Sequence, residues 1–78
     1  MRRYYFDLRD GDELAVDEEG LELSDLDAVQ QEATRALRDM AHEELYDSGS
    51  LARISVEVRD DAGAVMRVWI AFEIQRTN

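Results

Sequence analysis

The chain has 78 residues, the size of one small domain, and it contains no cysteine, which excludes disulfide frameworks and thiolate metal sites. Its formal net charge of −10 opposes binding to nucleic acid or to an anionic membrane surface. No apolar run approaches the length of a membrane span, so we expect no membrane-spanning segment.

The first predicted strand covers approximately residues 3–9. Its apolar side chains alternate with polar and charged ones, which is typical of a strand that is buried on one face. The inward side chains would be Tyr4, Phe6 and Leu8. Because this strand-like run follows Met1 almost at once, where a secretion signal would place an apolar segment, we expect a cytoplasmic protein.

A turn at Asp10-Gly11 leads to a second predicted strand of about 13–17. A three-residue loop would set Leu8 opposite Leu14 and so keep apolar residues together, whereas a two-residue turn at this dipeptide would not. We therefore expect the three-residue loop. After the next turn, residues 21–23 are a candidate for a further short extended segment.

A helix is predicted over residues of about 25–46, with Ser24 as its N-cap. Apolar residues recur there at the spacing of one helix face, which we expect to be buried. They are Leu26, Val29, Ala33, Ala36, Leu37, Met40 and Ala41. Ser48-Gly49 provides the stop signal.

The last part of the chain predicts a hairpin of two strands, about 52–59 and about 64–75. A three-residue loop with Gly63 in a left-handed conformation connects them in the register that sets apolar residues opposite one another. The resulting pairs are Asp60–Ala64, Val58–Met66, Glu57–Arg67, Val56–Val68 and Ile54–Ile70.

These elements predict an α+β fold of order ββαββ, in which one amphipathic helix covers one face of a four-stranded, mainly antiparallel sheet. The whole chain, residues 1–78, would form a single domain. The first and fourth predicted strands are the expected centre of the sheet, adjacent to one another. A chain this short buries only about 60% of its unfolded surface, so a second copy would add stability.

The same alternation places Trp69 on the sheet face that the helix leaves uncovered. This face carries five arginines against three acids, although the molecule as a whole is strongly acidic. Tryptophan, tyrosine and arginine are the residues enriched at interface hot spots. The candidate interaction face therefore consists of Arg3, Tyr5, Arg9, Arg53, Arg67 and Trp69. An ordinary solvated face, a protein interface and a stacking surface for single-stranded nucleic acid all remain open.

No pattern predicts an enzyme, a cofactor or a metal site. His42 is the only histidine and falls on the exposed helix face, without a serine or cysteine nucleophile beside it. The acidic stretch 10–22 does not match a calcium loop, because Gly11 stands at the wrong offset.

Several motifs, in this order, are fairly specific for one family. They are Tyr4-Tyr5-Phe6-Asp7-Leu8-Arg9-Asp10-Gly11, Asp17-Glu18-Glu19-Gly20-Leu21-Glu22-Leu23, Asp25-Leu26, Glu32-Ala33 and the alternating run 68–74. Over essentially the whole chain they resemble a family of short alphaproteobacterial proteins classed as a domain of unknown function. The resemblance implies a single compact domain and says nothing about activity or mechanism.

A weaker similarity is to the HicB-type antitoxin domain, which places strand hairpins before a Gly-Glu-x-Pro-Asp-Leu-like segment and a helix. Gly20, Glu22, Asp25 and Leu26 match it loosely, but the proline is missing. We expect a small non-enzymatic binding or assembly module whose partner is a second copy or another protein. The alternative is a nucleic-acid-associated or antitoxin-like regulator that uses the outer sheet face, although the net charge disfavours nucleic acid.

Overall fold

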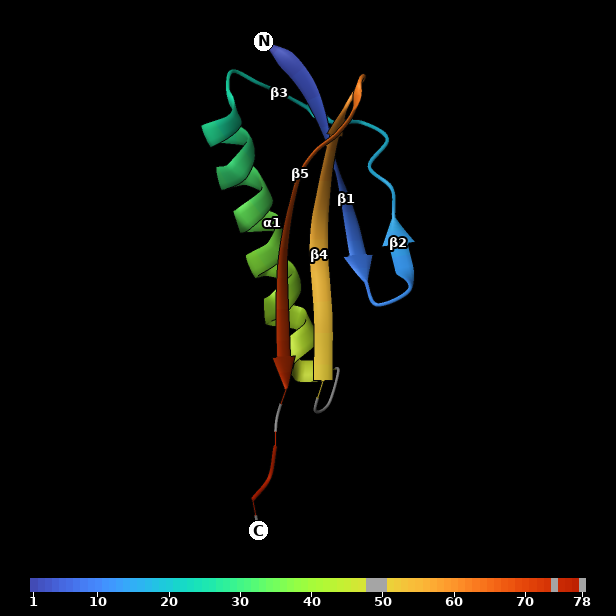
Figure 1. Ribbon diagram of the computed structural model, residues 1–78, viewed down its shortest axis with the longest axis vertical. Coiled ribbons are helices and arrows are strands. Elements are labelled where there is room, and N and C mark those ends of the chain that lie inside the picture. The colour runs from blue at the N-terminus through green and yellow to red at the C-terminus, as the bar shows by residue number, and fades with distance from the viewer. Residues whose placement is uncertain (48–50, 74, 78) are drawn as a thin grey trace.

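The computed structural model describes residues 1–47, 51–73 and 75–77. The elements are β1 (Arg2–Asp10), β2 (Glu13–Ala15), β3 (Leu21–Leu23), α1 (Leu26–Asp47), β4 (Leu51–Asp60) and β5 (Gly63–Glu73). The helix runs along one face of the sheet, and the molecule is elongated (Figure 1). The predicted α+β class is therefore confirmed. The predicted number of strands is wrong, because the segment Leu21–Leu23 adds a fifth strand to the sheet.

The sheet has the order β2-β1-β4-β5, with β3 also paired to β1, and every pairing is antiparallel. The central position of β1 agrees with the prediction. Its expected neighbour was the last strand, but β4 takes that place and β5 lies at the edge. Side-chain burial explains the difference. Val56 and Val58 of β4 are almost completely buried, whereas the side chains of β5 are half-buried or exposed.

The register of β4 and β5 confirms the predicted apolar pairs Val58–Met66, Val56–Val68 and Ile54–Ile70. The predicted pair Asp60–Ala64 and the three-residue loop are wrong, because Asp60 pairs with Gly63 across a two-residue turn. The Asp60 carboxylate explains the tighter turn, since it accepts hydrogen bonds from the backbone N–H groups of Ala62 (2.8 Å) and Gly63 (3.2 Å).

The tight turn is compensated by an irregularity in the β4–β5 register next to Arg59. Arg59 lies opposite Ala64, and the preceding residue, Val58, lies opposite Met66. Val65 is therefore an extra residue in β5, as in a β-bulge. Strict alternation from Arg67 would place Val65 on the outer face, but the extra residue lets Val65 pack against the core. The strand predicted as 64–75 is described as Gly63–Glu73; residue 74 lies outside the described residues, and residue 75 is not in a strand.

The first hairpin differs more from the prediction. Leu8 pairs with Ala15, not with Leu14, across a turn at residues 11–12 in which Gly11 has a φ of 59°. The second strand, predicted as 13–17, ends at Ala15, and Leu14 and Val16 are exposed. The chain leaves the sheet after Ala15 because Asp17 turns back to hydrogen-bond with β1.

The helix begins at Leu26, and Asp25 caps it by accepting a hydrogen bond from the Ala28 N–H at 2.8 Å. The predicted N-cap Ser24 is therefore wrong by one residue, and Leu26, expected in the core, is 56% exposed. The predicted stop at residues 48–49 lies outside the described residues.

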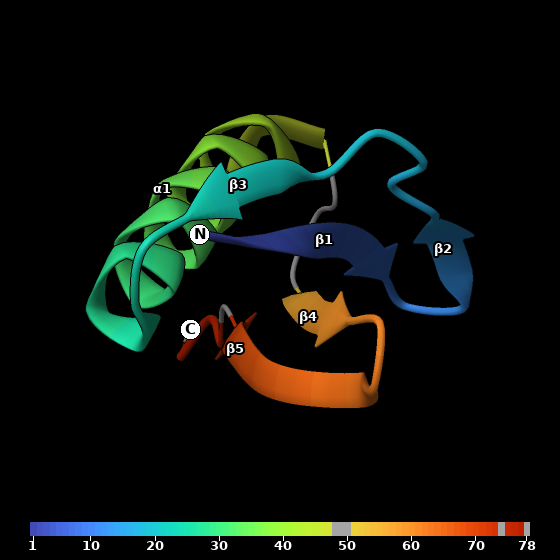
Figure 2. The ribbon, with the colours of Figure 1, turned by 90° about the horizontal axis from the view of Figure 1, so that it is seen from above.

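The core lies between α1 and the inner face of β1 and β4. Its buried side chains are Tyr4, Phe6, Val29, Ala33, Leu37, Ile54, Val56 and Val58. Figure 2 shows the helix on one side of the curved sheet only. We call the opposite, uncovered side the outer face.

Candidate interaction surface

The candidate residues all come from β1, β4 and β5, and the sheet register brings some of them together. Across the sheet, Arg9 lies opposite Ser55, which lies opposite Trp69, so these three form one row on the outer face. Arg53 lies one pleat away, opposite Ala71. Arg3 and Tyr5 belong to the other end of β1. The structure therefore divides the predicted face into two parts, one over β1 and β4 and one on β5.

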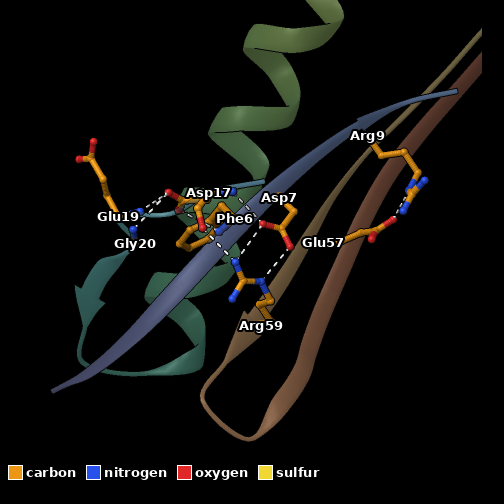
Figure 3. A network of polar contacts seen from close by, with 8 residues as sticks. All are labelled: Phe6, Asp7, Arg9, Asp17, Glu19, Gly20, Glu57 and Arg59. Atoms are coloured by element: carbon orange, nitrogen blue, oxygen red, sulfur yellow. Dashed lines mark hydrogen bonds and ion pairs between the residues drawn. The ribbon is translucent and has the colours of Figure 1, made fainter. Parts of the chain in front are cut away.

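The part over β1 and β4 is occupied by a polar network (Figure 3). The Nε atom of Arg59 donates a hydrogen bond to Asp7 Oδ2 at 3.0 Å, and a terminal nitrogen of the same guanidinium donates to the Asp17 carbonyl oxygen at 2.9 Å. The guanidinium carbon lies 4.5 Å from the centre of the Tyr5 ring. Asp7 is only 8% exposed, so its charge is compensated inside the molecule.

Asp17 completes this network at a gap in the sheet (Figure 3). β3 pairs with residues 2–4 of β1 and β2 pairs with residues 8–10, so the middle of that edge of β1 faces neither strand. The Asp17 side chain accepts a hydrogen bond from the Phe6 N–H there, at 3.1 Å, and the Asp17 N–H donates to Asp7 Oδ1 at 2.9 Å. A side chain thus takes over the hydrogen bonding that a continuous strand would provide.

The environment of Asp17 also changes its titration. Burial by itself raises the pKa of the Asp17 carboxyl, but hydrogen bonds from the N–H groups of Phe6, Gly20 and Glu19, together with the Arg59 charge, outweigh burial. The net effect is a pKa below the ordinary value. The ionised form of Asp17 is therefore part of the folded structure.

Two further arginines of the candidate face are paired within the chain. Arg9 Nε donates to Glu57 Oε2 at 2.8 Å, although the cross-strand register sets Glu57 opposite Arg67. Arg3 donates to the Glu19 carbonyl oxygen at 2.6 Å and lies 3.8 Å from the Glu22 carboxylate. The positive charge that the sequence places on this part of the face is therefore largely neutralised by neighbouring carboxylates.

The remaining exposed part of the face lies on β5. Trp69 is 60% exposed, and the Arg67 guanidinium carbon lies 5.2 Å from the centre of a Trp69 ring. We call the exposed outer-face side chains Arg67, Trp69, Ala71 and Glu73 the β5 strip. Within the described residues, neither Arg67 nor Arg53 forms an ion pair with a carboxylate. Arg53, Arg67 and Trp69 are thus the candidate residues that stay available for a partner.

Sequence reasoning did not find the network of Asp7, Asp17 and Arg59. The turn-forming run 17–20 was visible, with an aspartate that can hydrogen-bond its own turn, and its side chain indeed accepts from the Glu19 and Gly20 N–H groups. The missing information was the register of β1 against β4, because α1 separates these strands in the sequence.

Other chemistry finds little support in the part of the chain that the structure describes. Within that part, no three histidine, cysteine, aspartate or glutamate side chains are grouped so that they could hold a metal ion. No helix there combines the length and the apolar character that crossing a membrane requires.

Comparisons with known proteins give a single result. No curated protein and no solved structure matches the chain. The model of one family, described as "Domain of unknown function (DUF6894)", matches residues 3–71. The matched segment includes the whole polar network and reaches into β5 as far as Ala71. The chain belongs to the DUF6894 family of domains of unknown function.

Proposed function

We propose that this protein is a small, non-enzymatic binding and assembly module of the cytoplasm that associates with a second copy of itself through β5. One observation carries the proposal. β5 is an 11-residue strand at the edge of the sheet, and it presents Trp69 with 60% of its surface exposed. A tryptophan side chain offers much apolar area, and burying it against a partner is a large source of binding free energy.

The distribution of paired arginines supports the same surface. Arg3, Arg9 and Arg59 contact carboxylates of their own chain, so a partner that used them would have to break those ion pairs. Arg67 and Arg53 make no such pairs among the described residues, and Arg67 stands beside Trp69. The side chains that a partner could bind without breaking an ion pair described here, Trp69, Arg67 and Arg53, therefore lie on or next to the β5 strip.

The same pairing weighs against the alternative of a nucleic-acid-associated or antitoxin-like regulator. Binding of phosphate needs basic side chains whose charge is free to displace counterions. On the outer face, Arg9 and Arg59 are already held by Glu57 and Asp7, and the chain carries a net charge of −10. The alternative therefore depends on Trp69 and on Arg67 and Arg53, which form no ion pairs among the described residues.

Light scattering coupled to gel filtration tests the proposal over a series of micromolar protein concentrations. We expect a concentration-dependent dimer that Trp69→Ala weakens by about 10- to 100-fold, the range of a hot-spot residue. Leu26→Ala is the matched control, because it removes another exposed apolar side chain, from α1 instead of β5, and should leave the dimer unchanged.

Two outcomes would contradict the proposal. A monomer at every concentration would exclude self-association. A dimer whose affinity is unchanged by Trp69→Ala would exclude the β5 strip as its interface. Titration with short single-stranded RNA at low salt, followed by the fluorescence of Trp69, tests the alternative. We expect a flat response, whereas saturable quenching would favour the nucleic-acid function.

A further inference from the structure

The two edges of the sheet are protected very differently. On one side, β2 and β3 are only three residues long, and the Asp17 side chain occupies the gap between them. Short strands and charged side chains are the usual means by which proteins prevent unwanted strand pairing. On the other side, β5 is 11 residues long and contains neither proline nor lysine. Among the described residues, no strand pairs with the free edge of β5.

We propose that β5 pairs antiparallel with β5 of a second copy, in the register that sets Ile70 opposite Ile70 of the partner subunit. This inference rests on the proposed self-association and specifies its geometry. The two sheets would join into one continuous sheet, with both helices on the same face. The paired stretch, Arg67–Glu73, lies beyond the irregularity at Val65, so both strands are regular where they meet.

Charge complementarity selects this register. β5 carries one basic and one acidic side chain, Arg67 and Glu73, and both point to the outer face. With Ile70 on the two-fold axis, Arg67 of each copy lies opposite the partner's Glu73, so two ion pairs form. Opposite charges placed directly across antiparallel strands stabilise the pairing, and like charges oppose it.

The apolar side chains fit the same register. On the helix side of β5, Val68 and Phe72 are half-buried and Ile70 is 36% exposed. Pairing sets Val68 opposite the partner's Phe72, so an apolar row continues from one copy to the other. On the outer face, Trp69 lies opposite the partner's Ala71, a large side chain beside a small one. Pairing therefore brings the apolar side chains of the two strands into lateral contact.

Neighbouring registers lose these matches. A shift of two residues either sets the two Trp69 rings opposite each other, with Arg67 against the partner's Ala71, or sets Trp69 against the partner's Glu73. A shift of one residue sets side chains of the outer face opposite those of the helix side, which places Arg67 against the partner's Phe72. In each case both ion pairs are lost.

Cysteine cross-linking tests the register directly, because the natural chain contains no cysteine. Residues directly opposite each other in an antiparallel pair have Cα atoms about 4.5–5.5 Å apart, within the range that a disulfide bridges. We therefore expect Ile70→Cys to form a reducible dimer under mild oxidation. Ala71→Cys is the control, since its two copies would lie more than about 7 Å apart on the diagonal, too far for a disulfide.

The outcomes separate this inference from the function on which it rests. If the unaltered protein dimerises but Ile70→Cys does not cross-link, or Ala71→Cys cross-links equally well, the register is wrong while self-association stands. If the unaltered protein is monomeric at all concentrations, both proposals fail. Efficient cross-linking of Ile70→Cys alone supports both.

A charge exchange provides a second test that does not depend on oxidation. Arg67→Glu and Glu73→Arg each set like charges opposite one another twice, so each variant should dimerise about tenfold more weakly than the unaltered protein. An equimolar mixture of the two variants restores two attractive pairs and should form a heterodimer. Arg38→Glu makes the same charge change at an exposed position of α1, outside the candidate face, and should leave the dimer intact. A mixture that associates no better than the separate variants would overturn the register.

Discussion

Asp17→Ala is the substitution with the most informative expected effect on stability. In the folded protein the Asp17 carboxylate accepts hydrogen bonds from the N–H groups of Phe6, Glu19 and Gly20, each at 3.1 Å. The Phe6 N–H lies in the gap of the β1 edge between the segments that pair with β2 and β3. The substitution removes its acceptor, and no neighbouring strand can replace it.

The magnitude follows from how accessible the three donors are to water. An unsatisfied N–H at a buried position costs about 1–3 kcal/mol, and Phe6 itself is only 8% exposed. The Glu19 and Gly20 N–H groups lie in a surface turn where water can replace the carboxylate, at about 0.5 kcal/mol each. We therefore expect Asp17→Ala to lower the free energy of unfolding by about 2–4 kcal/mol. For a domain of this size that corresponds to a loss of about 10–25 °C in Tm.

Urea unfolding at neutral pH, followed by far-ultraviolet circular dichroism at one fixed protein concentration, measures this effect. Glu18→Ala is the matched control, because it removes the same charge from the adjacent, exposed position and should change stability by less than about 0.5 kcal/mol. If Asp17→Ala is as stable as Glu18→Ala, the Asp17 carboxylate does not hold β1 to the turn and our account of the gap is wrong.

Three further predictions concern the same framework. Because folding lowers the pKa of Asp17, the ionised carboxylate contributes stability above its unfolded pKa of about 3.9, and this stability is lost as pH falls through the folded pKa. Acid should therefore destabilise the protein, and Asp17→Asn should flatten the pH dependence of the unfolding free energy in urea titrations between pH 2 and 5. Gly20→Ala should lower Tm more than Gly11→Ala does, because both glycines have positive φ (73° and 59°) but only at Gly20 would a Cβ lie 2.8 Å from the Tyr4 carbonyl oxygen. Equal losses of Tm would contradict this. Val56→Ala should lower the unfolding free energy by about 2–3 kcal/mol, because Val56 is completely buried, and a loss near zero would mean that the core is not packed as described.

The sequence predicts the structure best where the two paired strands belong to the same hairpin. The β4–β5 register follows from apolar residues that meet apolar residues, and Val56 and Val68 indeed lie opposite each other. The turn itself was mispredicted, because the Asp60 side chain decides its length by hydrogen bonds that no alternation pattern contains. Local apolar patterns therefore predicted the pairing, and a polar side chain changed the last pair.

The agreement is worst where distant segments meet. The pattern of Leu14 and Val16 predicted a longer second strand, but the chain is diverted so that Asp17 reaches β1, and both residues remain exposed. The candidate face was likewise chosen by strand parity and charge, which placed Trp69 correctly on the outside. The alternation of side chains along each strand could not show that Arg59 and Arg9 pair with carboxylates of neighbouring strands, because that pairing depends on the β1–β4 register.

The distribution of charge bears on how two copies of so acidic a chain could associate. The net charge is −10, so two chains repel each other, and over distances beyond about 8–10 Å that repulsion is screened at physiological salt. Residues 10–22 hold seven acids and no basic residue, and they lie around β2 and β3. β5 lies at the opposite edge of the sheet and carries one arginine and one glutamate. Association through β5 therefore joins the two chains along a strand without net charge and keeps their acidic edges at the outer ends of the combined sheet. A contact through β2 or β3 would bring the acidic segments together, so electrostatics and the lengths of the edge strands favour the same edge.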